Sequence, residues 1–249
     1  MIIIKNKLAI DKMRIAGHRL AKILKDVSLF VKPGVDTATI DSFIEQNMKK
    51  ADLKTMCKGY RGYCHATCIS INDEIVHGVP SQKVVLKSGD FVKIDVVGSY
   101  QDYCADITRF YFVDSVGAEV QCLAQTAQRA LDKAIEISRP GIHLSDLSSA
   151  IQKVVEEAGF NVVRDFAGHG IGKNLHEPPD IPNYGEGGKG PILRSGMTLA
   201  IEPMITQGHW AIKIDKDGWT ARTADGKLSA HVEDTIAITS DGAEVLTRL

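Results

Sequence analysis

The sequence has almost no excess of either charge and no long hydrophobic run. Lysine and arginine total 30 against 31 aspartates and glutamates, which gives a formal net charge of −1. This balance argues against a dedicated nucleic-acid-binding protein, which should carry a clear basic excess. No apolar stretch approaches the roughly 18 residues of a membrane-spanning helix. The opening segment MIIIKNKLAI has only three consecutive isoleucines, too few for the apolar part of a signal peptide.

Cysteine is also scarce, with five residues in a chain of 249. An odd number of cysteines without an export signal favours reduced thiols and a cytoplasmic location. A chain of this length can bury a sizeable core without disulfides or a structural metal. Its 44% hydrophobic and 24% charged residues are ordinary for a globular protein.

The hydrophobic pattern predicts two helices followed by strands, and then the same order again. Helical spacing predicts helices over 11–31, from the N-cap Asp36 onward, over 119–138 and over 144–158. Strands are predicted over 68–71, 91–99, 105–113, 198–206, 211–214, 230–239 and 243–247. The Gly- and Pro-rich stretch 177–191 is predicted to be a loop.

Two short motifs recur with a single offset of 107 residues. Val31–Val35 (VKPGV) resembles Ser138–Ile142 (SRPGI), and Leu86–Gly89 (LKSG) resembles Leu193–Gly196 (LRSG). Separated motifs with one offset indicate an internal duplication. We therefore predict one catalytic domain over residues 1–249, built from halves of about 1–115 and 116–249.

The duplication equates Asp95 with Glu202, and each is followed by a second acid in a predicted strand. Asp106 follows the first, and Glu233 follows the second after a longer interval that fits an inserted loop around 217–219. Two packed halves would bring these four acids together. Buried carboxylates need compensating charge, and two divalent cations bridged by carboxylates provide it compactly.

Histidines near the predicted strand pairs offer a nitrogen ligand. His169 lies between two glycines, which permit close approach of the backbone to a ligand. His77 has a comparable place in the first half, and His176 follows His169 by seven residues.

These residues, in this order, resemble the dinuclear metal set of type I methionine aminopeptidases. The resemblance extends over essentially all of the chain. The motifs that carry it are Asn72–Pro80 (NDEIVHGVP), Gly168–Gly172 (GHGIG), His176–Pro179 (HEPP) and Ile201–Met204 (IEPM). It implies an α+β pita-bread fold, in which two α/β halves related by a pseudo-twofold axis surround a central dinuclear metal cleft. The implied activity is removal of the N-terminal methionine from nascent polypeptides whose second residue is small.

The resemblance also implies a role for each residue. Asp95 would bind one metal, His169 and Glu202 the other, and Asp106 and Glu233 would bridge both. Glu202 would in addition act as the general base toward the attacking water. The remaining catalytic and substrate-binding residues would be His77 and His176 beside the scissile amide, and a methionine pocket of Cys57, Tyr60, Tyr63, Cys68 and Trp219.

Three positions depart from the family pattern. Leu175 stands where an aromatic residue often lines the methionine pocket, Arg61 where a histidine is frequent, and Asp234 follows Glu233. The first two bear on pocket shape rather than on the chemistry.

The implied cofactors are two divalent ions, and the oxygen-rich donor set suits Co²⁺, Mn²⁺ or Fe²⁺. The implied partners are nascent polypeptide N-termini, with the ribosome as a further candidate; no nucleic-acid or membrane partner is expected, and we expect a monomer. Two alternatives stay open. One is an Xaa-Pro peptidase of the aminopeptidase P or prolidase type, which usually carries an additional N-terminal domain. The other is a non-catalytic binding module with the same fold.

Overall fold

The computed structural model describes residues 1–249 and shows the predicted order of elements in both parts of the chain. The first half has two helices, one short 3₁₀ turn over Tyr60–Gly62 and five strands. These elements are α1 (Lys7–Val27), α2 (Thr37–Lys50), β1 (Lys54–Thr55), β2 (Thr67–Ile71), β3 (Glu74–Val76), β4 (Phe91–Tyr100) and β5 (Tyr103–Phe112).

The second half repeats the helix pair and adds more, shorter strands. They are α3 (Ala118–Ile137), α4 (Leu144–Glu157), β6 (Asn161–Val162), β7 (Ala167–Gly170), β8 (Glu177–Pro182), β9 (Thr198–Ile201), β10 (Met204–Thr206), β11 (Ile212–Ile214), β12 (Ala221–Thr223), β13 (Ser229–His231), β14 (Glu233–Ile238) and β15 (Ala243–Val245). The predicted insertion around 217–219 is the turn of the β11–β12 hairpin.

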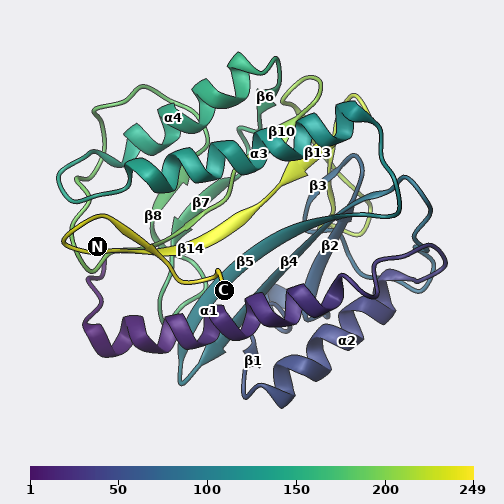
Figure 1. The fold of residues 1–249 in the computed structure, drawn as a ribbon, viewed down its shortest axis with the longest axis horizontal. Helices are drawn as coiled ribbons and strands as arrows, with labels where there is room; N and C mark the ends of the chain where they lie inside the picture. Colours follow the sequence, from purple (N-terminus) through teal and green to yellow (C-terminus); the bar gives the residue numbers. More distant parts are fainter.

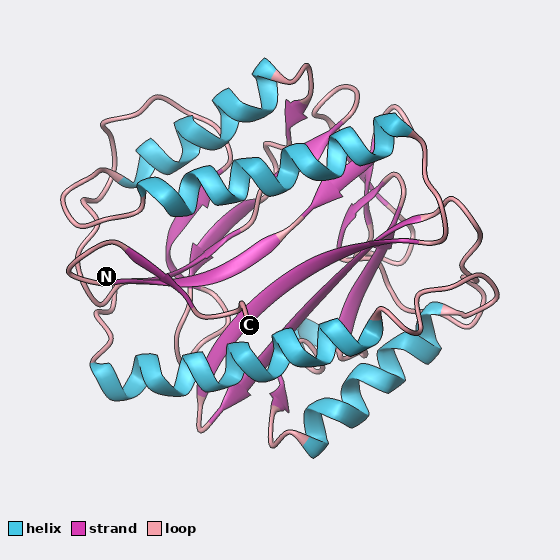
Figure 2. Cartoon of the chain, in the orientation of Figure 1, coloured by secondary structure: helices cyan, strands magenta, loops and turns pink.

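One antiparallel sheet of nine strands runs through both halves. Its order is β1-β4-β5-β14-β9-β7-β8, with β2 also paired to β4 and β15 to β14. Strands β4 and β5 pass through the middle of Figure 1 beside β14, with α1 and α2 along one side and α3 and α4 along the other. The two helix pairs enclose the strands in the same way in Figure 2. The halves meet where β5 pairs with β14, and Glu233 lies opposite Thr108.

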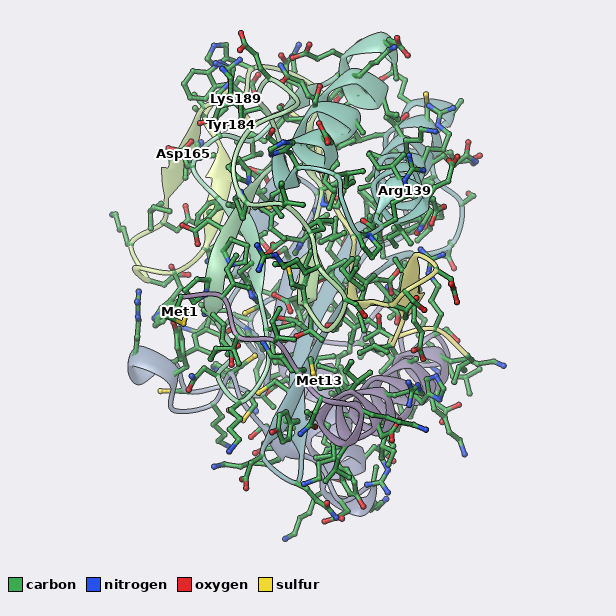
Figure 3. The ribbon with its side chains drawn as sticks, turned by 90° about the vertical axis from the view of Figure 1, so that its left-hand side faces the viewer. Met1, Met13, Arg139, Asp165, Tyr184 and Lys189 are labelled. Atoms are coloured by element: carbon green, nitrogen blue, oxygen red, sulfur yellow. The ribbon has the colours of Figure 1, made fainter.

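Each helix pair covers its own apolar core. A cluster of 20 buried residues packs α1 and α2 onto β4 and β5, and one of 22 packs α3 and α4 onto the strands of the second half. A third cluster bridges the halves and includes Met13 of α1 and Leu175. Figure 3 shows Met13 on α1, while Tyr184 and Lys189 lie at the opposite end of the molecule.

The repeated motifs make the same backbone hydrogen bonds in both halves. The Gly34 N–H donates to the Leu86 carbonyl at 2.9 Å, and the Gly141 N–H donates to the Leu193 carbonyl at 3.0 Å. Both glycines have positive φ angles, 87° and 95°, which glycine adopts without strain in the Pro-Gly turn between the two helices of each half. Residues 107 positions apart therefore make equivalent hydrogen bonds, in addition to being similar in sequence.

Several predicted boundaries were wrong. The predicted strands 198–206 and 230–239 are each two strands, β9 with β10 and β13 with β14, and the two members of each pair belong to different sheets. The first helix begins at Lys7 instead of residue 11, because the side chain of Asn6 caps it by accepting from the Ala9 N–H at 2.9 Å, and it ends at Val27. Part of the predicted 177–191 loop is strand β8, which pairs with β7. Proline is tolerated there because β8 is the last strand of the sheet and needs donors on one side only.

No helix in the structure combines the length and the apolar character that crossing a membrane requires.

Candidate metal centre

The register of three strands sets the acids of the two halves on one face of the sheet. Asp95 of β4 lies opposite Thr108 of β5, and Thr108 lies opposite Glu233 of β14. Residues opposite one another across a sheet share a face, as do residues two apart along a strand. Asp106, two residues before Thr108, therefore projects from the same face as Asp95 and Glu233.

The predicted ligands of the second half are placed by the same rule. His169 of β7 lies opposite Ala200 of β9, and Ala200 lies opposite Thr235, two residues beyond Glu233. Glu202 follows Ala200 by two residues and so continues its face. The His169 Nε2 atom lies 3.8 Å from Asp106 Oδ2 and 3.7 Å from Glu202 Oε1.

All five predicted metal ligands line one cavity of about 410 Å³. Asp106, His169 and Glu233 bring one ligand atom each to within 4.8 Å of one another, and all three side chains are buried. Asp95 and Glu202 line the same cavity, although they are outside that closest group.

The acids are strongly perturbed by their surroundings. Burial raises the pKa of Asp106 well above its usual range, and repulsion from Glu233, Asp95 and Glu202 raises it further. Burial is also the main cause of the raised pKa of Glu202 and of Glu233. The pKa of Asp95 is raised by burial as well. Carboxylates in this arrangement cannot all be ionised without added positive charge.

The protein does not supply that charge itself. Lys93 lies on β4 two residues before Asp95, but its ammonium group donates to the carbonyls of Asn72 at 2.9 Å and Ser229 at 3.2 Å. Carboxylate oxygens of Asp95, Asp106 and Glu233 are buried without a hydrogen-bond partner. Buried oxygens without a donor are the condition that a bound cation relieves, so this donor set fits divalent metal ions.

The tautomer and the charge state of His169 suit it to bind a metal ion. Its Nδ1 lies 2.9 Å from the Gly170 carbonyl, which accepts a hydrogen bond from the Nδ1–H and leaves the Nε2 lone pair directed at the acids. Burial, together with His176, lowers the pKa of His169 to about 4, so the ring is neutral at pH 7. Glycine at position 168 allows close approach of a neighbouring strand rather than of a ligand, because a Cβ there would lie 2.5 Å from the Ala200 carbonyl oxygen.

His77 and His176 lie on the wall of the same cavity. His77 has a φ of 60°, an uncommon region for a residue with a side chain, and its ring stands edge-on to Phe166 at 5.3 Å. The His176 ring lies 4.3 Å from that of His169, and its Nδ1 is 3.0 Å from the Tyr60 hydroxyl. When that hydroxyl donates to Nδ1, the Nε2–H of His176 remains available as a donor.

The five residues predicted for the methionine pocket all line this cavity, as do Arg61 and Leu175. Tyr63 and Trp219 pack edge to face at 5.0 Å, and the Tyr63 hydroxyl donates to the Thr67 carbonyl at 2.9 Å. Burial raises the pKa of the Cys57 and Cys68 thiols well above their usual range, so both present neutral, polarisable sulfur.

Three residues that lie beside the predicted ligands were missed by the sequence analysis. His231 is buried, with its Nε2 atom 3.3 Å from Glu202 Oε2. The Thr108 hydroxyl donates to Glu233 Oε2 at 3.1 Å, and the Thr235 hydroxyl contacts the backbone of Asp106. The sequence offered one signal for two of them: His231 and Thr235 each lie two residues from Glu233, and residues two apart along a strand share a face.

A curved antiparallel sheet that gathers buried carboxylates and a neutral imidazole from both halves defines a metal-dependent hydrolase. The profile of metallopeptidase family M24 matches residues 11–240. The methionine aminopeptidase of Clostridium acetobutylicum is 42% identical over 247 residues, with 99% of each chain covered. The crystal structure of the Thermotoga maritima methionine aminopeptidase matches with a TM-score of 0.99 and 45% identity over the whole of both chains.

The chain belongs to metallopeptidase family M24 and has its pita-bread fold, which confirms the predicted fold class. The resemblance to type I methionine aminopeptidases is confirmed as well. A prolidase from Pyrococcus furiosus shares the fold with a TM-score of 0.81, at 27% identity, and this chain covers 66% of it.

Proposed function

We propose that this protein is a methionyl aminopeptidase, a metal-dependent hydrolase that removes the N-terminal methionine from polypeptides. The observation that carries the proposal is the convergence of five donor residues from both halves in the cavity that the predicted methionine-pocket residues also line. Relatives of about 40% identity over the full chain carry the name of this activity. The Xaa-Pro alternative is not favoured, since the prolidase relatives match only the fold with lower identity and coverage.

Each ligand has a place in the proposal. Asp95 would hold one divalent ion, His169 and Glu202 the other, and Asp106 and Glu233 would bridge the two. When bound, the ions neutralise the acids, lower the pKa of water and polarise the substrate carbonyl. The oxygen-rich donor set suits Mn²⁺, Fe²⁺ or Co²⁺.

The chain's own residues handle the protons and the substrate. Glu202 takes the proton from the attacking water and returns it to the leaving amine, a role that suits a carboxylate whose pKa burial has raised. His176 donates from Nε2 to the oxygen on which negative charge develops, and His77 contacts the scissile amide. The unbranched methionine side chain fills the pocket between Tyr63, Trp219 and the two thiols.

The finer parts of the proposal concern setting and substrate. The natural substrates would be nascent chains with a small second residue. The enzyme would be a cytoplasmic monomer, and the ribosome is its candidate partner. The predicted limits of the halves, near residue 115, are part of the same proposal, because each half brings its own helix pair and core.

A metal-titrated assay tests the proposal. Metal-free protein would be reloaded with Mn²⁺, Fe²⁺ or Co²⁺ and given Met-Gly, Met-Ala, Met-Leu and Xaa-Pro peptides. We expect cleavage of Met-Gly and Met-Ala, little of Met-Leu and none of the Xaa-Pro peptide. Preferred Xaa-Pro cleavage would overturn the specificity, and binding of metal without turnover of any peptide would favour a non-catalytic module.

A further inference from the structure

The buried side chain of His231 approaches the proposed general base and has no role in the mechanism above. His231 ends β13 and lies opposite Met204 of β10, two residues after Glu202. This register brings His231 beside the residue pair that follows β9, close to Glu202. Its Nε2 atom is buried, lacks any hydrogen-bond partner and lies 3.3 Å from Glu202 Oε2.

The Glu202 carboxylate lies between two imidazoles. Its Oε1 atom is 3.7 Å from His169 Nε2, and its Oε2 atom faces His231. The backbone of Glu202 is held by Asn183, whose amide donates to the Glu202 carbonyl at 3.1 Å. No side chain in the structure donates a hydrogen bond to either carboxylate oxygen, so His231 is the one neighbour placed to orient the carboxylate.

His231 is placed as a partner of Glu202 rather than as a metal ligand. All five proposed ligands line the cavity, whereas His231 is buried and is not among the residues that line it. Groups behind the ligands commonly fix ligand orientation by a hydrogen bond, and their loss typically costs 10- to 100-fold in metal affinity.

Resting on the proposed function, we propose that His231 is a positioning residue for Glu202. Its Nε2–H donates to Glu202 Oε2 and turns Oε1 toward the cation that Glu202 shares with His169. A carboxylate held in this way keeps one oxygen for the metal and presents a fixed edge to the attacking water.

Two amide variants provide a matched test. In His231→Gln the amide nitrogen reaches about the position of the imidazole Nε2, whereas in His231→Asn the same group is one methylene shorter. His231→Ala removes the donor, and His18→Ala on the exposed face of α1 is the control. Each metal-free variant would be titrated calorimetrically with Mn²⁺ and then assayed on Met-Ala.

We expect one of the two Mn²⁺ affinities to fall about 10- to 100-fold in the Ala and Asn variants, while the other stays unchanged. Turnover should fall with little change in KM, and His231→Gln should restore both properties to within about threefold. Parental affinity in His231→Ala would overturn the proposal. So would a Gln variant that binds a single metal, because His231 would then be a ligand.

The binding arm separates this inference from the proposed function. Calorimetry needs no substrate, so it judges His231 even if the wild-type protein binds two metals and cleaves no methionyl peptide. If His231→Ala does not fold, the Mn²⁺ affinities of the Gln and Asn variants, which carry the same polar group, test the proposal in its place. Equal affinities in these two variants would overturn it.

Discussion

The hydroxyl of Thr235 holds the backbone of Asp106 on both sides. It accepts a hydrogen bond from the Asp106 N–H at 2.9 Å and donates one to the Asp106 carbonyl at 2.8 Å. Thr235 belongs to β14 of the second half and Asp106 to β5 of the first. A side chain of one half therefore completes the hydrogen bonding of a proposed bridging ligand in the other.

Thr235→Val should destabilise the protein and weaken metal binding. The substitution preserves shape but leaves the buried N–H and carbonyl of Asp106 without partners, at about 1–3 kcal/mol for each group. Thr239→Val is the matched control, since the Thr239 hydroxyl also donates to one backbone carbonyl, of Gly242, and accepts from one backbone N–H, of Asp241, in a turn at the surface. Urea unfolding of the two metal-free variants measures the free energy of unfolding of each. Equal losses of stability would mean that the hydrogen bonds from Thr235 to Asp106 contribute no more than those of Thr239 at the surface.

Asp106→Asn should abolish turnover and lower metal content. The substitution preserves size but removes the charge proposed to bridge both ions, in a site where four acids depend on added positive charge. Metal analysis after dialysis, together with a Met-Ala assay, measures the two effects. Asp180→Asn, at the wall of the same cavity, is the control. Activity near that of the parent in Asp106→Asn would contradict the bridging assignment.

His77→Ala should reduce turnover by about 10²- to 10³-fold, the usual loss when a donor to the reacting group is removed. Metal stoichiometry should remain that of the parent, because the proposal gives His77 a contact with the scissile amide and no contact with a metal. His209 is an exposed histidine in the loop between β10 and β11, and His209→Ala should change neither property. Loss of metal from His77→Ala would instead make His77 a ligand.

Metal binding at neutral pH should release protons. Because burial raises the pKa of Asp106, Glu202 and Glu233, the metal-free site retains protons at a pH where free carboxyl groups have lost them. Cation binding requires the ionised forms, so these protons leave, and affinity falls as the pH decreases. Calorimetry in buffers of different ionisation enthalpy counts the protons. Titrations with no proton release would show that the acids are already ionised.

Much of the fold was predictable because the sequence repeats itself. The offset of 107 residues and the two turn motifs were visible as letters, and the structure shows matching backbone hydrogen bonds at Gly34 and Gly141. The acids were predictable for the same reason, since Asp95 and Glu202 occupy equivalent places. The comparisons confirm the pita-bread fold and the family that these residues indicated.

The parts that escaped prediction depend on strand register or on a cap. His231 comes close to Glu202 only through the pairing of β13 with β10, and Thr235 reaches Asp106 through the pairing of β14 with β5. Sequence spacing gives the face of each residue within its own strand but does not fix which strands become neighbours. Strand β8 was missed because its prolines indicate a loop unless its place at the sheet edge is known.

The pairing of β5 with β14 has a consequence for how metal ions enter and leave. Since the two halves share one hydrogen-bonded sheet, they cannot swing apart as hinged lobes without breaking its central ladder. The spacing of Asp106 and Glu233 is therefore set by backbone geometry before any cation arrives. A metal ion can therefore reach these acids only through the cavity that they line, and not by separation of the two halves.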